Sequence, residues 1–598
     1  MTIDELPFDP DALRGKYRIE RDKRVRSDGN EQYIEVVGDF SNFVDDPYIE
    51  EVIERAPLTD DTDVIVIGGG FGGLLAGARL RDHGVESIRL IEKGGDFGGT
   101  WYWNRYPGAM CDVESYVYLP LLEELDYIPS EKYVHAAEIL EHSRAIGRHY
   151  DLYDNACFQT EVTDLRWSAE EQRWIVSTNR GDAMRAKFVT MANGPLHRPK
   201  LPGIEGINDF EGHTFHTSRW DYDYTGGGPH GELTRLAGKR VGIIGTGATA
   251  VQCVPHLAEG AEHLFVFQRT PSSIDVRNNR PTDPDWAASL QPGWQTERMQ
   301  NFNALVSGQP QPVDLVDDGW TDIIGKLLVR IQRAGSEADL SADGLGRAME
   351  LADFEKMEEI RRRAQEIVDD PATAEALKPW YRQFCKRPCF HDDYLDAFNR
   401  PNVTLVDTDG RGVDRITAAG IVANGVEYPL DCIVFATGFE VGTDYSRRAG
   451  YDVTGRTGET LSAKWADGMA TLHGMLSHGF PNLFIMSPGQ AGFTVSFPHL
   501  LSEQAGHIAH LVGTALERDA DEIEVTEEAE EAWVATIIDK ARISLPFLES
   551  CTPGYYNNEG QPEKRAAQNS SYGGGSIEYF RLLAEWRERG DFAGVEVR

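Results

Sequence analysis

Short apolar runs rich in β-branched residues alternate along the chain with segments of helical periodicity, as in an α/β protein. The first such run, DVIVIGGGFGG at residues 63–73, contains glycines spaced Gly68-x-Gly70-x-x-Gly73. That spacing is typical of a strand–turn–helix unit that binds a dinucleotide. Gly68 permits the tight turn, Gly70 lets a pyrophosphate approach the backbone, and Gly73 lets the next helix pack closely. The pattern predicts a helix that starts near Gly70 and points its free N–H groups at the phosphates.

A second strand is expected in SIRLIE at residues 87–92, which ends in Glu92. An acid about 20 residues beyond the first glycine is placed to meet a ribose hydroxyl. A strand, the glycines, a helix and an acid in this order indicate a dinucleotide site far more specifically than the glycines alone.

The same pattern recurs in VGIIGTGATA, which contains Gly245-x-Gly247-x-x-Ala250. Its second strand, LFVFQR, ends in Arg269, so a basic residue stands where the first copy has an acid. An arginine beside the ribose suits a 2′-phosphate and favours NADPH over NADH. The alternative is an arginine that only covers a sheet edge.

The fold class predicted from these patterns is α/β, with two Rossmann-like dinucleotide-binding domains, one inserted in the other. Glycine-bearing crossings at residues 191–194 and 436–439 indicate where the chain passes between the domains. The expected divisions are an N-terminal extension at 1–57, the first part of the first nucleotide domain at 58–200, the second nucleotide domain at 201–440 with a helical insertion at 273–380, and the remainder of the first domain with a C-terminal tail at 441–598. In the extension, Asp9-Pro10-Asp11 predicts the start of a basic helix, whose charged face either packs on an acidic part of the protein or, as is more usual, is solvated.

The stretch GGTWYWNRYPGAMCD at residues 98–112 follows the first acid. Gly98 and Gly99 permit close approach of the backbone to a flat ligand, and the aromatic residues supply rigid walls. Trp103 is expected to be ordinary core. Asp112 closes this largely apolar run and is either part of a site or a local turn or cap residue.

Composition and charge narrow the range of partners. The chain has 598 residues, 41% of them hydrophobic, which is enough for several full cores. Its net charge of −38 argues against nucleic acid and anionic membrane surfaces, because their phosphates would be repelled. No apolar run reaches the length of a membrane span, and the acidic N-terminus is not a signal peptide.

The seven cysteines are few and scattered, which indicates reduced thiols in a cytoplasmic protein. Cys385-x-x-x-Cys389 is too sparse for a zinc site, so no metal is expected. No pattern in the sequence indicates an oligomeric state.

One further motif carries a family likeness. FEGHTFHTSRWD at residues 210–221, between the two glycine patterns, resembles the fingerprint of the Baeyer–Villiger monooxygenases, and residues 98–112 resemble that family's second signature. The resemblance covers about residues 60–560. It implies an enzyme that uses FAD in the first domain and NADPH in the second. Such an enzyme inserts one oxygen atom from O₂ beside the carbonyl of a small-molecule ketone, through a flavin peroxide intermediate, to give an ester or lactone.

The resemblance also implies roles for individual residues. Asp112 matches the active-site aspartate, Arg387 the catalytic arginine, and Lys386 and Arg269 the basic residues that hold the 2′-phosphate. His216 would lie at the domain junction. Residues expected to bind the cofactors are Gly68, Gly70, Gly73, Glu92, Gly99, Thr100, Trp101, Asp112, Gly245, Gly247, Arg269, Thr270 and Lys386.

The implied chemistry agrees with these residue types. A buried peroxide anion and an oxyanion adduct both need a fixed positive charge, and a guanidinium at Arg387 supplies one that Asp112 can orient. Residues 1–57 and the tail 551–560 resemble the subgroup acting on large or cyclic ketones. Many relatives have a tryptophan where this tail reads CTPGYY.

Three other functions share parts of the pattern. A flavin monooxygenase that oxidises sulfur or nitrogen shares every cofactor motif. A disulfide reductase would need two close cysteines beside the flavin, and Cys111 has no near partner in the sequence. A non-catalytic flavin sensor would not consume NADPH.

Overall fold

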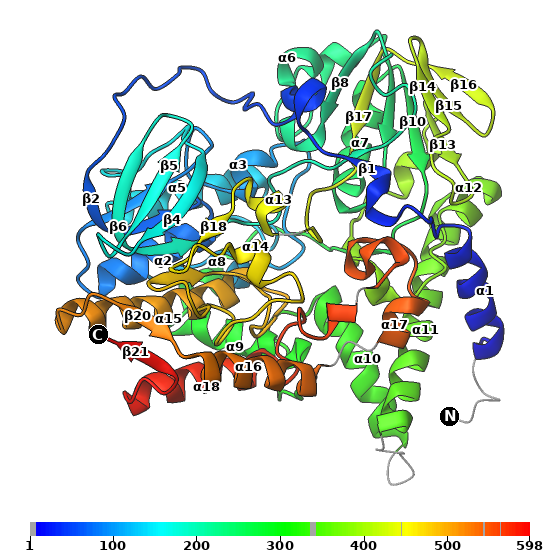
Figure 1. Cartoon of the computed structure of the whole chain (residues 1–598). Helices are drawn as coiled ribbons and strands as arrows, with labels where there is room; N and C mark the ends of the chain where they lie inside the picture. Colours follow the sequence, from blue (N-terminus) through cyan, green and yellow to red (C-terminus); the bar gives the residue numbers. More distant parts are fainter. Residues whose placement is uncertain (1–6, 335–341, 444, 542–544, 563) are drawn as a thin grey trace.

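The computed structural model describes residues 7–334, 342–443, 445–541, 545–562 and 564–598. Two sheets organise the molecule, the first at the left and the second at the upper right of Figure 1. The first has the strand order β18-β4-β5-β6-β2-β3, with β19 paired to β6. Its strands are β2 (Asp61–Ile67), β3 (Ile88–Ile91), β4 (Val162–Ser168), β5 (Arg173–Thr178), β6 (Ala183–Met191), β18 (Val453–Thr454) and β19 (Leu483–Ile485). The last two strands show that the chain returns to this sheet late in the sequence.

The second sheet is parallel throughout, in the order β13-β10-β9-β17-β8. Its strands are β8 (His213–His216), β9 (Arg240–Ile244), β10 (His263–Gln268), β13 (Val403–Asp407) and β17 (Cys432–Phe435). All of them lie between two passes of the chain through the first sheet. The predicted fold class is therefore confirmed, while the division at 200 and 440 stays a prediction.

The remaining strands form small sheets of two or three strands. They are β1 (Tyr33–Ile34) with β7 (Leu201–Pro202), β11 (Ile274–Asp275) with β12 (Cys389–Phe390), β20 (Ile523–Val525) with β21 (Val595–Val597), and the hairpins of β14 (Arg415–Thr417), β15 (Gly420–Ala423) and β16 (Val426–Pro429).

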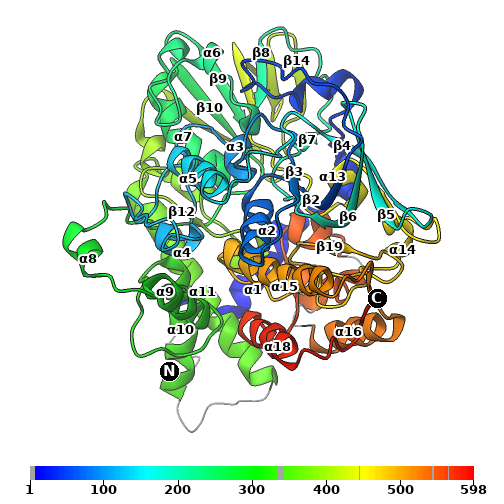
Figure 2. The same cartoon turned by 90° about the vertical axis from the view of Figure 1, so that its left-hand side faces the viewer.

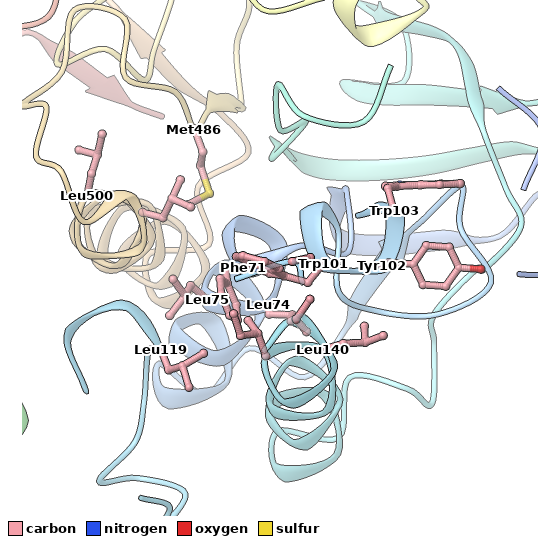
Figure 3. Packing of buried hydrophobic residues seen from close by; sticks show 14 of the residues in the cluster. Phe71, Leu74, Leu75, Trp101, Tyr102, Trp103, Leu119, Leu140, Met486 and Leu500 are labelled. Atoms are coloured by element: carbon pink, nitrogen blue, oxygen red, sulfur yellow. The ribbon is translucent and has the colours of Figure 1, made fainter. Parts of the chain in front are cut away.

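Helices α2 and α15 pack against each other beside the first sheet (Figure 2). Figure 3 shows Leu74 and Leu75 of α2 in the core that also contains Leu140 and Leu500. Because α2 is buried on nearly all sides, its sequence is apolar and small rather than amphipathic. The helices around the two sheets are α2 (Phe71–Asp82), α3 (Thr100–Trp103), α4 (Ser115–Tyr118), α5 (Ala136–His149), α6 (Tyr222–Thr225), α7 (Ala248–Gly260), α13 (Tyr445–Ala449), α14 (Leu461–Lys464), α15 (Phe497–Glu517), α16 (Glu527–Lys540), α17 (Leu545–Ser550) and α18 (Ser576–Arg589).

The insertion is helical, as predicted, and the extension packs on it. It contains α8 (Pro284–Ser289), α9 (Trp294–Val306), α10 (Gly319–Ala334), α11 (Ala342–Ile367) and α12 (Pro371–Ala376). In the extension, α1 (Pro10–Asp22) begins at the predicted cap, Asp9, and lies beside α11 (Figure 1). Its basic face is not simply solvated, because Arg14 pairs with Glu350 at 2.7 Å, and Arg24, two residues beyond the helix, is buried.

Short 3₁₀ helices complete the secondary structure. They are η2 (Gly29–Gln32), η3 (Gly38–Phe43), η4 (Thr217–Arg219), η5 (Thr234–Leu236), η7 (Gln383–Cys385), η8 (Asp396–Asn399), η9 (Tyr555–Gly560) and η10 (Lys564–Ala566). Within the described residues, no helix has both the length and the apolar character needed to cross a membrane.

The expectation that all cysteines are reduced is wrong for two of them. Cys385 and Cys551 form a disulfide across 166 residues of sequence. Spacing could not reveal this pair, because the fold brings the C-terminal tail back beside η7. The other five cysteines, at 111, 157, 253, 389 and 432, are free.

Candidate active site

A cavity of about 1070 Å³ lies between the two sheets and is lined by both glycine-rich turns. Residues from the insertion's return segment and the C-terminal tail, including Arg387 and Tyr555, also line it. Among the predicted site residues, those that line the cavity are Gly68, Gly70, Glu92, Gly99, Thr100, Trp101, Asp112, Gly245, Gly247, Arg269, Thr270, Lys386 and Arg387. Gly73 is the exception, because it lies behind the turn.

The first turn is built for close packing and for a free helix start. A Cβ on Gly73 would lie 1.8 Å from the carbonyl oxygen of Gly68, so any side chain there would break the turn. Helix α2 begins after Gly70 without a side-chain cap, and Gly70 and Phe71 line the cavity. The N–H groups of the first helical turn are therefore available to an anionic ligand.

Glu92 lies where the sequence predicts an acid. Its carboxylate accepts hydrogen bonds from the backbone N–H groups of Gly69 and Gly94, each at 2.7 Å. Burial raises the pKa of Glu92, opposed by these two hydrogen bonds. Strand, glycines, helix start and acid together fit the adenosine and pyrophosphate of a dinucleotide.

Gly99 lines the cavity at a point where two backbone segments cross. A Cβ on Gly99 would lie 2.5 Å from Cα of Gly70, and Gly99 has a φ of +52°. Glycine at 99 is therefore required by the crossing of two backbone segments, the second being the nucleotide turn itself. Its neighbour Trp101 is buried and donates from Nε1 to the Tyr118 hydroxyl at 3.1 Å. Trp103 is core, as predicted, with the Arg219 guanidinium over its ring.

The second turn repeats this construction with different neighbours. Gly245 has a φ of +113°, and a Cβ there would lie 2.4 Å from the carbonyl oxygen of Ala436. Helix α7 starts after Gly247 without a side-chain cap. Thr270 accepts a hydrogen bond from Thr246 Oγ1 at its carbonyl oxygen, which ties the end of β10 to this turn.

Arg269 and Lys386, the residues expected to hold a phosphate, both line the cavity. Arg269 donates to Gln32 Oε1 at 2.7 Å, and its Nη2 lies 3.3 Å from Glu559 Oε2. Burial, and secondarily the charge of Arg269, lowers the pKa of Lys386 to about 8. Two clustered cations at a cavity wall fit a dianionic phosphate. The sequence did not predict Gln32 and Glu559, because they come from opposite ends of the chain.

Asp112 is buried and lies between two arginines. Oδ1 accepts a hydrogen bond from Nη2 of Arg277 at 2.5 Å, and Oδ2 lies 3.6 Å from Nε of Arg387. The expected direct hydrogen bond from Arg387 is thus replaced by a looser ion pair. Burial lowers the pKa of Arg387, but the Asp112 carboxylate and the neighbouring Tyr556 and Tyr555 together raise it more, so the net shift is upward. The Asp112 carbonyl accepts a hydrogen bond from Trp320 Nε1 at 3.0 Å.

Arg277 is the main residue that sequence reasoning missed. It lies two residues beyond β11 in a polar segment, where most arginines are at the surface. Only the fold, which brings it next to Asp112, distinguishes it from them.

The mouth of the cavity carries exposed aromatic side chains. Phe493, Tyr555 and Tyr556 are 52%, 40% and 46% exposed, and all three line the cavity. Large exposed rings at a concave site favour a bulky apolar ligand.

His216 is fully buried and does not line the cavity. Its Nδ1 contacts the Ser218 hydroxyl at 2.9 Å, and its ring packs on Phe439, next to the crossing at 436–439. Burial lowers the pKa of His216 to about 3, so it is neutral at physiological pH. This position agrees with a role at the domain junction.

Comparisons with known proteins give one consistent result. The model of the pyridine nucleotide-disulphide oxidoreductase family matches residues 65–307. Neopentalenolactone D synthase from Streptomyces avermitilis is 57% identical over 99% of each chain. A Baeyer–Villiger monooxygenase from Streptomyces coelicolor is 50% identical over 97% of this chain and 96% of its own. The polycyclic ketone monooxygenase of the fungus Thermothelomyces thermophila has a TM-score of 0.91 at 40% identity, covering 98% of this chain and 99% of its own.

Proposed function

The chain belongs to the Baeyer–Villiger monooxygenases, and from that membership we propose that its substrate is a rigid polycyclic ketone. It is a flavin monooxygenase that uses FAD and NADPH and inserts one oxygen atom beside a ketone carbonyl to give an ester or lactone. These statements were predicted from the sequence and are confirmed. The finer substrate class, the co-substrate O₂ and the roles of individual residues are proposals.

The shape of the site supports a bulky substrate. Asp112 and Tyr118 line the same cavity of about 1070 Å³ as the two nucleotide turns. The exposed rings of Phe493, Tyr555 and Tyr556 add apolar surface to the lining of this cavity. One relative is named for a polycyclic ketone and another for a lactone, in agreement with a rigid fused-ring substrate.

The observation that carries the proposed residue roles is the Asp112–Arg387 pair at the cavity wall. When bound, FAD reduced by NADPH would supply the activated oxygen, which comes from O₂. Arg387 keeps its positive charge at working pH and would stabilise negative charge that develops on the substrate oxygen. Asp112 balances that charge and restricts where the guanidinium lies. Arg269 and Lys386 would hold the 2′-phosphate of NADPH.

The test is NADPH consumption over a panel of ketones that runs from small monocyclic to fused-ring compounds, with mass spectrometry of the products. We expect fused-ring ketones to gain one oxygen atom with the highest kcat/KM. Turnover confined to small ketones would reject the substrate class. Sulfides and amines are tested beside the ketones, and oxygen gained at sulfur or nitrogen, with no ester from any ketone, would favour heteroatom oxidation instead.

A cytoplasmic location stays a prediction. It rested in part on reduced thiols, and the Cys385–Cys551 disulfide removes that support. Fractionation of the producing cells would test it directly.

A further inference from the structure

Two arginines share the Asp112 carboxylate, and only one of them faces the cavity. Arg387 lines the cavity with a side chain that is 39% exposed, whereas the Arg277 side chain is 4% exposed and lies behind the carboxylate. The buried arginine is the closer one: Nη2 of Arg277 lies 2.5 Å from the carboxylate, whereas Nε of Arg387 lies 3.6 Å from it.

Arg277 also connects the two segments that carry the reacting pair. Its Nε donates to the Phe390 carbonyl at 2.9 Å, and its Nη1 donates to the Cys111 carbonyl at 3.3 Å. Strands β11 and β12 pair with Ile274 opposite Cys389. Arg277 therefore follows one strand of this ladder and Arg387 precedes the other. A single guanidinium joins the Asp112 segment to the strand that begins just after Arg387.

This arrangement limits how closely Asp112 and Arg387 can approach. A buried carboxylate with one cationic neighbour would form a direct charge-assisted hydrogen bond with it. Here Oδ1 is already bound by Arg277, whose planar fork is fixed by two backbone carbonyls. This bond holds the carboxylate in place, with its other oxygen, Oδ2, 3.6 Å from Nε of Arg387. Arg387 therefore lines the cavity with its guanidinium outside hydrogen-bond distance of Asp112.

We propose that Arg277 is a positioning residue, which holds Asp112 at a distance that keeps Arg387 available to the substrate carbonyl. The proposal rests on the proposed role of Arg387. Arg277 touches neither the cavity nor any predicted cofactor contact except Asp112, so it acts through Asp112.

The test compares three variants. Arg277→Met removes the charge and the planar set of N–H donors. Arg277→Lys keeps the charge but presents it on a single ammonium group. Arg363→Met is the matched control, because Arg363 also bonds carbonyls across the β11–β12 region, those of Ile274 at 3.2 Å and His391 at 3.0 Å, rather than Asp112. Flavin content, the rate of flavin reduction by NADPH, the ketone KM, and ester formed per NADPH consumed are measured for each.

We expect Arg277→Met to lower kcat for ester, and ester per NADPH, by about 10- to 100-fold through misplaced reacting groups, with little change in ketone KM or flavin reduction. Arg277→Lys should recover part of the yield, and Arg363→Met should keep all of it. Normal ester yield in Arg277→Met, or an equal loss in Arg363→Met, would overturn the proposal. If Arg277→Met binds no flavin, Arg277→Lys decides: reduced yield with normal flavin reduction supports the proposal, and full yield overturns it.

Arg387→Ala in the same assay distinguishes the role of Arg277 from the proposed role of Arg387, on which it depends. If Arg387→Ala keeps its ester yield, the role of Arg387 is wrong. If Arg387→Ala loses ester while Arg277→Met does not, only the role of Arg277 is wrong.

Discussion

Arg269 donates a hydrogen bond from Nη1 to Oε1 of Gln32, with 2.7 Å between the two atoms. Gln32 belongs to the N-terminal extension, and Glu559 of the C-terminal tail contacts the same guanidinium. Segments from both ends of the chain thus fix the direction of an arginine that the nucleotide domain supplies. The extension is therefore part of the proposed NADPH site and not only a covering of the insertion.

Arg269→Ala should impair NADPH selectively. A charged hydrogen bond contributes about 1.5–3 kcal/mol, or roughly 10- to 100-fold in affinity. The KM for NADPH should rise by that factor while the KM for NADH barely changes. Arg240→Ala, which removes a half-exposed pair with Asp431, is the control. Equal losses for both cofactors would show that Arg269 is structural.

Gly73→Ala should abolish flavin binding, whereas the purified wild-type protein should be yellow with non-covalent FAD. The new Cβ would collide with the Gly68 carbonyl at 1.8 Å, inside the turn that receives the pyrophosphate. Gly506→Ala in α15 is the matched control, because nothing lies within 4 Å of its Cβ position. It should keep flavin and gain about 0.5–1 kcal/mol from helix propensity. Flavin absorbance per protein measures the flavin content of both variants, and urea unfolding measures the stability of Gly506→Ala. A yellow Gly73→Ala protein would refute the packing argument.

The first nucleotide turn and the surroundings of Asp112 show which parts of the site a sequence can and cannot predict. Gly68, Gly70, Gly73 and Glu92 act within one strand–turn–helix–strand unit, so their spacing carries the information. Arg277 meets Asp112 only after the second sheet and its insertion have folded. The disulfide partner of Cys385 is likewise set by tertiary folding, since Cys551 lies in the tail. Local patterns therefore predict the cofactor turns, and family resemblance predicts the active-site pair, but neither predicts the residues that hold that pair in place.

The protein should lose stability as the pH falls below neutrality. Burial lowers the pKa of His473 to about 3 and that of His499 to about 4, against about 6.5 in an unfolded chain. Below pH about 6.5 the unfolded state binds more protons, so stability is fully present above that pH and is lost progressively toward pH 3–4. Urea midpoints at several pH values measure the effect.

Matched histidine variants test the cause. His499→Phe keeps a ring against Phe580 but cannot titrate, so its midpoint should depend less on pH. His149→Gln, at an exposed position, should leave the pH dependence unchanged. An identical pH dependence in His499→Phe and the wild type would exclude His499 as a contributor.

Thiol counting should reveal the Cys385–Cys551 disulfide. Alkylation of the unfolded protein without reductant should label the five free cysteines, and reduction should expose all seven. Cys551→Ser frees Cys385, so its count should no longer change on reduction. Seven labelled cysteines in the unreduced wild-type protein would mean that the bond does not form in solution.

Arg387→Ala should uncouple NADPH consumption from ester formation. Without Arg387, negative charge developing at the substrate carbonyl loses its fixed counter-charge. Losing such a stabiliser costs about 3–4 kcal/mol, or on the order of 10²–10³ in rate. The variant should still bind FAD and accept hydride from NADPH, since the nucleotide turns are untouched, and should release hydrogen peroxide in place of ester.

Asp112→Ala should produce a similar defect, because Arg387 and the buried Arg277 would both lose their counter-ion. As Asp112 and Arg387 act as one unit, the double variant should be little worse than Arg387→Ala alone. Ester and hydrogen peroxide formed per NADPH consumed measure both effects. Arg382→Ala is the control, because Arg382 pairs with Asp353 rather than with Asp112 and does not line the cavity. If Arg387→Ala keeps a near-normal ester yield, another cation must face the substrate carbonyl.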